Sequence, residues 1–378
     1  MFSVAVSDII VVNNTKGGKN KDLMSKLTYI DKPVFGFDIG RSSIKIMQVD
    51  ATIKGKSKVI GYGNTSFDPK SIQKGVIIDF EAVAKATKEL FDTQFVGTLS
   101  TKRVAFSIPN EYSFSRVLSL PHMSDKDLRT AVLSEASRTI PMKNEDLYID
   151  YEVGAEVSGD MQEIQLVATP RDIIDSYITL SELLDLEVAI VETNIAAVSR
   201  IVTHAEGYDI VSLIIDLGST AADLSIYDGT TVRITGTADC GSENITSLIA
   251  KKLSVSTTQA HTIKTRYGIE PSKKQAEILD SIRPELDKLL SEIRKMIRYY
   301  NERAIDGQEI GQIIILGGGA NLPGLSGFIT DQIRIPTRLC DPWQNITFGG
   351  LQAPHQLETT LYTTAAGLSL APTEDMAE

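Results

Sequence analysis

The chain has 378 residues, a net charge of -11 at pH 7 and a pI near 5.0. Broad binding to nucleic acid or to anionic lipid requires a basic surface, so this charge argues against both functions. Cys240 and Cys340 are the only cysteines, which excludes a disulfide framework, and no apolar run approaches the roughly 20 residues that span a bilayer. We therefore expect a cytoplasmic protein.

The first half of the chain alternates strand and helix patterns around one module of a different kind. Residues 1–32 lack a periodic pattern and are expected to be a flexible extension. Residues 33–100 and 176–206 form the predicted first lobe, which includes a helix over residues 79–94. Residues 101–175 follow a strand, helix, strand, strand pattern, which predicts an α+β subdomain inserted into that lobe.

Residues 207–378 form the predicted second lobe, so the expected fold class is α/β. Three strands come first, and Asp228 and Gly229 between the last two are a strong signal for a hairpin turn. A helical subdomain follows over about residues 243–308, and its last helix carries an apolar stripe that is typical of a core-facing surface. The stripe consists of Leu286, Leu289, Leu290, Ile293, Met296, Ile297 and Tyr300.

One short pattern occurs twice. The stretches "FGFDIGRSSIKIMQV" and "LIIDLGSTAADLSIY" both contain a strand, an Asp, an apolar residue, a Gly, a turn and a second strand. Asp38 therefore matches Asp216, and Gly40 matches Gly218. A single Asp and Gly turn after a strand is common for backbone reasons alone. Two copies in separate α/β stretches instead indicate an internal duplication, with two similar lobes facing one cleft.

The repeated turn suits a polyphosphate ligand. A tight turn after a strand leaves successive backbone N–H groups that can bind an anion, and glycine lets the backbone approach phosphate oxygens closely. The carboxylates of Asp38 and Asp216 would repel the phosphates unless a divalent cation lay between them, so we expect Mg²⁺ held through water at these two residues. The three glycines of "LGGGANLPGL" follow a buried strand and predict an adenosine-binding turn.

Two such turns followed by a GGG turn, in that order, resemble the actin-like ATPase superfamily. An α+β insertion in the first lobe is similar to the branch that contains the division protein FtsA and the type IV pilus assembly family PilM, and the chain resembles PilM most closely. The resemblance covers residues 33–370 and rests on "FDIGRSSIKIMQV", "EASRTIPMKNEDLYIDYEV", "IIDLGSTAADLSIYDG", "GSENITSLIA", "IKTRYG", "IILGGGANLPGL" and "CDPWQNI". It implies an actin-like ATPase fold, in which two duplicated α/β lobes surround a nucleotide cleft and the first lobe carries the inserted α+β subdomain.

The resemblance also implies a site for ATP. By position, the residues assigned to nucleotide are Asp38, Gly40, Arg41, Ser42, Ser43, Asp216, Gly218, Ser219, Thr220, Gly241, Glu243, Asn244, Lys264 (near the base or ribose), Gly317, Gly318, Gly319 and Asn321. Glu192 matches a position where relatives place an acid that orients water; the alternative is a carboxylate favoured by a helix N-terminus. Arg41, Ser242 and His261 depart from the family pattern, so we expect ATP binding with weak or absent ATPase activity.

The function that the resemblance implies is that of an adaptor in type IV pilus assembly. Such a protein binds the N-terminal cytoplasmic tail of a PilN-like inner-membrane protein, in a groove expected beside residues 101–175. It links that membrane platform to the pilus motor ATPases and lies at the inner face of the membrane through its partner. Two alternatives remain, an FtsA-like division protein recruited to membranes and a small-molecule kinase of the same superfamily.

Overall fold

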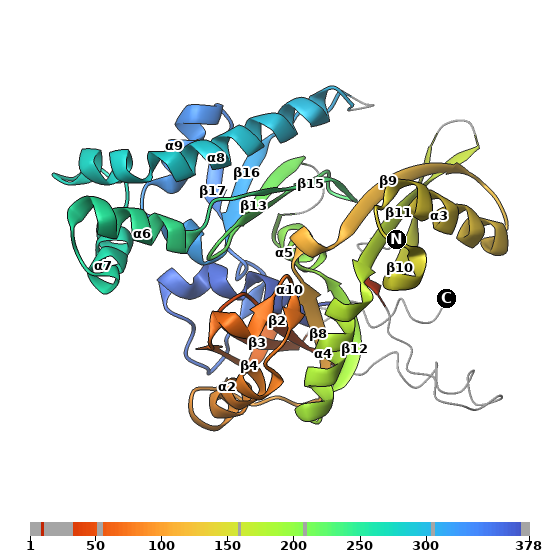
Figure 1. Cartoon of the computed structure of the whole chain (residues 1–378), viewed down its shortest axis with the longest axis horizontal. Coiled ribbons are helices and arrows are strands. Elements are labelled where there is room, and N and C mark those ends of the chain that lie inside the picture. Colours follow the sequence, from red (N-terminus) through yellow and green to blue (C-terminus); the bar gives the residue numbers. More distant parts are fainter. Residues whose placement is uncertain are drawn as a thin grey trace. The chain divides into compact units, whose positions relative to one another are not determined.

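The computed structural model describes residues 9–10, 33–50, 56–157, 160–206, 210–303 and 307–371. These residues form two compact units (Figure 1). The first unit contains the described residues up to Ile201, together with Trp343–Ala353 and residues 364–371, and the second contains Val202–Pro342 and Pro354–Thr363. Apart from Ile9 and Ile10, the predicted extension over residues 1–32 lies outside the described residues.

A mixed sheet is the centre of the first unit. Its strands are β1 (Ile9–Ile10), β2 (Phe35–Ile39), β3 (Ser43–Asp50), β4 (Ser57–Ser66), β7 (Val96–Gly97), β8 (Arg103–Ile108), β12 (Glu187–Thr193) and β18 (Ile346–Thr347). The order among the described residues is β1-β12-β8-β2-β3-β4-β18, with β7 paired to β4. β2, β8 and β12 run parallel, whereas β2, β3 and β4 form antiparallel hairpins. A small antiparallel pair, β5 (Ile72–Gln73) and β6 (Val76–Ile77), lies outside this sheet.

Helices cover both faces of the main sheet. Side chains alternate between the two faces along each strand, and apolar residues on both faces are buried by these helices. The helices are α2 (Phe80–Thr93), α4 (Arg171–Leu183), α5 (Asn194–Glu206) and α10 (Thr363–Ser369). Phe37 of β2 and Phe106 of β8 belong to the core that α2 and α4 complete. Ala105, the neighbour of Phe106, packs instead with Ala197 of α5 and Leu368 of α10. The helix predicted over residues 79–94 is observed as α2, and the Asp79 side chain caps its N-terminus.

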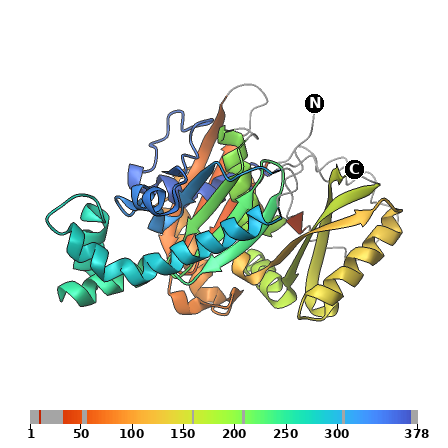
Figure 2. The same cartoon turned by 90° about the horizontal axis from the view of Figure 1, so that it is seen from above.

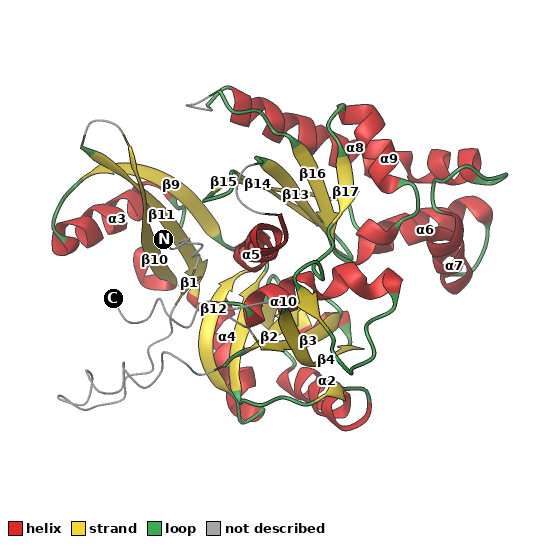
Figure 3. Cartoon of the chain, turned by 180° about the vertical axis from the view of Figure 1, so that it is seen from behind, coloured by secondary structure: helices red, strands yellow, loops and turns green. Residues whose placement is uncertain are grey.

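A second, smaller layer is built from residues between β8 and α4. It consists of β9 (Phe114–Pro121), α3 (Asp125–Thr139), β10 (Leu147–Val157) and β11 (Met161–Pro170). The sheet order is β10-β11-β9, and α3 lies against this sheet (Figure 3). The Ser124 hydroxyl caps α3 by accepting the backbone N–H of Asp127 at 3.3 Å. This layer has its own apolar core and is the α+β subdomain that the sequence pattern predicts.

The second unit is built on a five-stranded sheet. Its strands are β13 (Ser212–Leu217), β14 (Ala222–Tyr227), β15 (Val232–Ala238), β16 (Gln312–Leu316) and β17 (Thr337–Leu339). The order is β15-β14-β13-β16-β17, with β13, β16 and β17 parallel. The predicted hairpin turn at Asp228 and Gly229 is confirmed, because the Asp228 carboxylate accepts the N–H groups of Thr230 and Thr231 at 2.9 and 2.8 Å.

Four helices complete the second unit, namely α6 (Ser242–Leu253), α7 (Thr257–Tyr267), α8 (Gln275–Asn301) and α9 (Leu325–Ile333). α8 is one long helix with α6 and α7 near its beginning (Figure 2). The predicted apolar stripe of α8 is confirmed: each of its residues is buried except Ile297, which is partly buried against the same core. None of the described helices is both long and apolar enough to cross a membrane.

The end of the chain returns to the first unit, which the sequence pattern did not predict. β18 pairs in parallel with β4. A Cβ on Gly36 would lie 2.0 Å from the carbonyl oxygen of Ala365, and a Cβ on Gly367 would lie 2.0 Å from that of Ala197. The backbone of α10 therefore touches β2 and α5 directly, and this contact holds residues 364–371 in the unit formed by the start of the chain.

Substitution by alanine is expected to change the free energy of unfolding in opposite directions at two helical glycines, Gly367 and Gly327. Gly367→Ala is expected to lower the free energy of unfolding by about 1–3 kcal/mol, because its methyl group has no room beside Ala197. Gly327→Ala in α9 meets nothing within 4 Å and is expected to raise stability by about 0.5–1 kcal/mol through helix propensity. Urea unfolding of both variants measures the two effects, and equal signs would contradict the close contact of α10.

Candidate nucleotide-binding site

The two repeated turns have the same backbone geometry. In the turn between β2 and β3, the N–H of Gly40 donates to the carbonyl of Ser43 at 2.9 Å. In the turn between β13 and β14, the N–H of Gly218 donates to the carbonyl of Ala221, also at 2.9 Å. The equal bonds at equal spacing support the predicted duplication.

Backbone donors in both turns are available for an anion. Among the described residues, the N–H groups of Arg41 and Ser42 and those of Ser219 and Thr220 make no hydrogen bond to protein. Successive unpaired N–H groups in a tight turn form a concavity that suits phosphate oxygens. Arg41 is exposed in the first turn, so its guanidinium adds a positive charge there without filling the turn.

The carboxylate in the first turn has a partner that the sequence prediction missed. Asp38 and Lys45 face each other across the β2–β3 hairpin, and Lys45 Nζ donates to Asp38 Oδ2 at 3.2 Å. Ser107 of β8 donates its hydroxyl to Asp38 Oδ1 at 2.8 Å. In the second hairpin the position opposite Asp216 is occupied by Asp223. The hairpin register is the signal that could have found Lys45, since it places the lysine opposite Asp38.

The second turn lies against the beginning of α6. The N–H of Ser242 donates to the carbonyl of Gly218 at 3.0 Å. A Cβ on Gly241 would lie 2.3 Å from Cα of Thr220, so only glycine allows this approach. The second turn, Gly241 and the N-terminus of α6 thus form one cluster, whose helix dipole favours negative charge.

Lys264 of α7 reaches the same cluster. Its Nζ donates to the Ser242 hydroxyl at 2.6 Å and to the Ser242 carbonyl at 3.0 Å. Burial lowers the pKa of Lys264 to about 8, partly offset by the negative charge of Glu243. The pKa of His261 is also lowered, by burial and then by the charge of Lys264. Ser242, one of the residues that depart from the family pattern, therefore supplies a protein partner for this lysine.

The GGG turn lies next to the second aspartate. β13 and β16 are parallel neighbours with Asp216 opposite Leu316, so their carboxyl ends meet. Gly317 has φ +82°, and a Cβ there would lie 2.3 Å from Asp216 Oδ1. Gly318 is exposed, whereas Gly319 is buried against Leu217. The structure therefore brings Asp216, the second turn, Gly241, Lys264 and the GGG turn together in one unit.

Two of the residues predicted to bind nucleotide form side-chain hydrogen bonds to other residues of the chain. Asn321 donates its amide to the carbonyl of Leu357 at 2.7 Å and to the hydroxyl of Thr360 at 3.0 Å. Both partners belong to the 3₁₀ helix Gln356–Tyr362. Asn244 donates to Glu285 of α8 at 3.4 Å. These side chains fix the GGG turn and α6, and their contact with nucleotide stays a prediction.

Glu192 lies at the end of β12 and is fully buried. Both of its carboxylate oxygens accept hydrogen bonds from the Arg200 guanidinium at 2.8 Å, and Arg200 also donates to the carbonyl of Gly367 at 2.7 Å. A carboxylate with both oxygens committed to a guanidinium is a structural ion pair. The predicted role of Glu192 in orienting water stays a prediction.

Direct metal ligation has no support in the described residues. No group of three or more His, Cys, Asp or Glu side chains in that part of the chain is placed to hold a metal ion. Asp38 and Asp216 belong to different units, and each is described only within its own unit. A Mg²⁺ ion that uses them through water would take its remaining ligands from phosphate and water, which is typical of magnesium.

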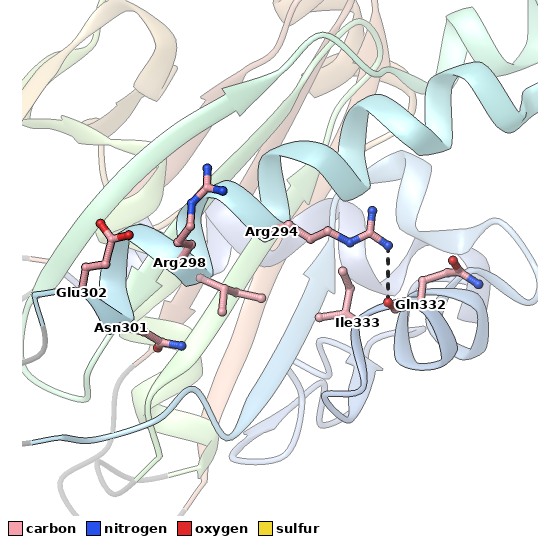
Figure 4. Close-up of a pocket in the computed structure, with 7 residues that line it drawn as sticks. Arg294, Arg298, Asn301, Glu302, Gln332 and Ile333 are labelled. Carbon is pink, nitrogen blue, oxygen red and sulfur yellow. Dashed lines mark hydrogen bonds between the residues drawn. The ribbon is translucent and has the colours of Figure 1, made fainter.

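A separate pocket of about 490 Å³ opens between α8 and α9. It is lined by Arg294, Ile297, Arg298, Asn301, Glu302, Gln332 and Ile333, and Arg294 donates to the Gln332 carbonyl at 3.5 Å (Figure 4). The pocket contains none of the predicted nucleotide ligands. It therefore gives no information about the ATP site.

Comparison with known proteins places the chain in a family. A family model described as type IV pilus assembly protein PilM matches residues 36–372. The chain belongs to the PilM family. The match covers both units and the inserted α+β subdomain, so the whole described fold, apart from β1 and the start of β2, falls within the family.

Individual relatives agree with the fold. The cell division protein FtsA of Borreliella burgdorferi is 24% identical over 350 residues, which are 81% of this chain and 84% of that protein. The PilM-PilN type IV pilus biogenesis complex matches with a TM-score of 0.77 and 21% identity, over 92% of this chain and 99% of the other. MreB 5 of Spiroplasma citri bound to AMPPNP matches with a TM-score of 0.51 and 11% identity, over 89% and 95% of the two chains. This PilM family member therefore has the actin-like ATPase fold.

The ion pair of Glu192 can be tested by removing one charge. Glu192→Gln keeps the size of the side chain but leaves the Arg200 guanidinium buried without a counter-charge, so the free energy of unfolding should fall by about 3–5 kcal/mol. The matched control is Glu182→Gln, an exposed glutamate in the last turn of α4, for which we expect a loss below about 1 kcal/mol. Urea unfolding measures both, and equally small losses would contradict a structural role for Glu192.

Proposed function

We propose that this PilM family member binds ATP with Mg²⁺ and acts as an adaptor in type IV pilus assembly. The observation that carries the nucleotide site is the cluster in the second unit, where the turn after Asp216, the N-terminus of α6, Lys264 and the GGG turn meet. MreB, which shares the fold, is bound to AMPPNP in its solved structure. The turn after Asp38, in the first unit, has the same backbone hydrogen bond and the same unpaired N–H groups.

The residues present fit a magnesium nucleotide. Unpaired N–H groups at Ser219 and Thr220 and the positive end of the α6 dipole suit phosphate. The exposed backbone of Gly318 leaves space for a flat base or ribose. Lys45 and Lys264 add positive charge, and Asp38 and Asp216 are the acids through which Mg²⁺ would be held by water. When bound, the ion would neutralise phosphate charge.

ATP turnover is proposed to be weak or absent. The acid that the family pattern assigns to water is Glu192, and its carboxylate is buried in the Arg200 ion pair. A general base must reach the water whose proton it takes. ATP would then act on the balance between conformations of the chain, through its differential affinity for them.

The proposed partner is the N-terminal cytoplasmic tail of a PilN-like inner-membrane protein. The PilM-PilN complex, which matches this chain over 92% of its length, supports a partner of this kind. We propose that the tail binds as an extended peptide beside the α+β subdomain, a known mode of peptide recognition. Through this tail the chain would sit at the inner face of the membrane and connect the membrane platform with the pilus motor ATPases.

The pKa of Lys264 predicts how nucleotide affinity depends on pH. Because this pKa is about 8 in the free protein, the amine loses its proton as the pH rises through 8, and a neutral amine attracts the nucleotide less. The dissociation constant for Mg-ATP, measured by calorimetry from about pH 7 to about pH 9.5, should therefore rise across this range. Lys264→Met should bind more weakly at pH 7 and lose this pH dependence, whereas Lys251→Met, an exposed lysine of α6, should behave as wild type. A wild-type affinity that is constant over the range would contradict the assignment.

Binding of the partner tail tests the adaptor function directly. A labelled peptide with the N-terminal cytoplasmic sequence of the organism's PilN-like protein should bind the full chain, as measured by fluorescence anisotropy. Its affinity should change when Mg-ATP is added, because both ligands bias the same conformations. A scrambled peptide is the control. If the peptide does not bind, the adaptor function is refuted. If it binds with the same affinity with and without Mg-ATP, only the coupling between nucleotide and tail binding is refuted.

A further inference from the structure

The short strand β1 pairs with the edge of β12 that faces away from β8. β1 pairs antiparallel with β12, with Ile9 opposite Glu192 and Ile10 opposite Val191. On its other side β12 is the parallel neighbour of β8. β1 lies between β12 and β10 of the α+β subdomain (Figure 3), and it contacts β10 as well. An extended backbone of this chain thus occupies the sheet edge beside the subdomain.

This edge is suited to an extended peptide. An edge strand presents a row of backbone N–H and C=O groups that can pair with another chain. Because these hydrogen bonds join backbone to backbone, they form with many different sequences of the added strand. The pairing in β1 is short, only two residues. The sequence around it, "DIIVVNN", contains four consecutive β-branched residues, which favour strands.

The edge is also held in place. Val191 is completely buried, and the Glu192 carboxylate beside it is fixed by Arg200, which in turn holds α10 through the Gly367 carbonyl. A strand whose position is fixed before binding loses less freedom when a peptide pairs with it. β12 is therefore a preorganised surface for strand addition.

We propose that the N-terminal segment around Ile9 and Ile10 competes with the partner's tail for the outer edge of β12. This inference rests on the proposed binding of an extended tail beside the α+β subdomain. The chain then carries its own competitor, and the tail binds only the fraction of molecules in which β1 has left the edge. The apparent dissociation constant of the tail is the intrinsic one divided by that fraction.

Proline substitutions in the full chain test the competition. Ile9→Pro combined with Ile10→Pro removes both backbone donors of β1 and should increase the affinity for the labelled tail peptide by at least about threefold, since more molecules have a free edge. The matched control is Lys16→Pro combined with Asn20→Pro, in the same segment but outside β1, which should leave the affinity unchanged. An affinity of the first variant equal to or lower than that of wild type overturns the inference. If neither variant nor wild type binds the tail, the proposed function fails as well.

A reversible crosslink provides the opposite test. Directly opposed residues of antiparallel strands lie about 4.5–5.5 Å apart at Cα, a distance that a disulfide can bridge, so Ile10→Cys with Val191→Cys should form a crosslink under oxidation. The crosslinked chain should lose tail binding, and reduction should restore it. The single variant Val191→Cys, checked by thermal unfolding, controls for the change in the core. No crosslink, or a crosslinked chain that still binds the tail, overturns the inference.

Discussion

One buried guanidinium connects three elements of the first unit. Arg200 of α5 binds both oxygens of Glu192 on β12 and the backbone carbonyl of Gly367 on α10. Burying an ion pair is costly unless its geometry is good, and here the bidentate bond and the third acceptor satisfy both terminal nitrogens of the guanidinium, while its Nε has no hydrogen-bond partner among the described residues. The same contact fixes β12, holds the returning end of the chain in α10 and binds the acid to which the family pattern assigns the orientation of water. The proposed strand addition and the proposed weak ATP turnover would therefore both depend on one interaction.

A second constraint acts through backbone contact in the other unit. Gly241 allows the turn after Asp216 to approach α6, and Gly317 allows the GGG turn to approach the Asp216 carboxylate. Any side chain at either position would separate segments that lie far apart in the sequence. The proposed nucleotide cluster is thus defined by the absence of side chains, while Lys264 and Ser242 supply its polar contacts.

The two repeated turns are alike in backbone and different in charge. Each closes with the same glycine hydrogen bond, but Lys45 stands opposite Asp38, whereas Asp223 stands opposite Asp216. The lysine compensates the first aspartate directly, at 3.2 Å. The second hairpin places two acids across from each other.

The sequence by itself determined the local features of this protein. The two Asp and Gly turns, the hairpin at Asp228 and the apolar stripe of α8 depend on residues within a few positions of each other, so their patterns are visible in the chain. The order of the two turns and the GGG turn resembled the actin-like ATPase superfamily, and stretches such as "EASRTIPMKNEDLYIDYEV" resembled the PilM family.

Only the tertiary structure decided which distant groups meet. The pairing of Glu192 with Arg200, the contact of α10 with β2, the protein partners of Asn321 and the position of β1 on β12 depend on how the chain closes on itself. Local sequence patterns do not show which distant residues come into contact, because a single acid or a short apolar segment can be buried against many different partners. The sequence therefore identified the turns that could bind a nucleotide, and the fold determined which of the residues around them are already committed to the protein.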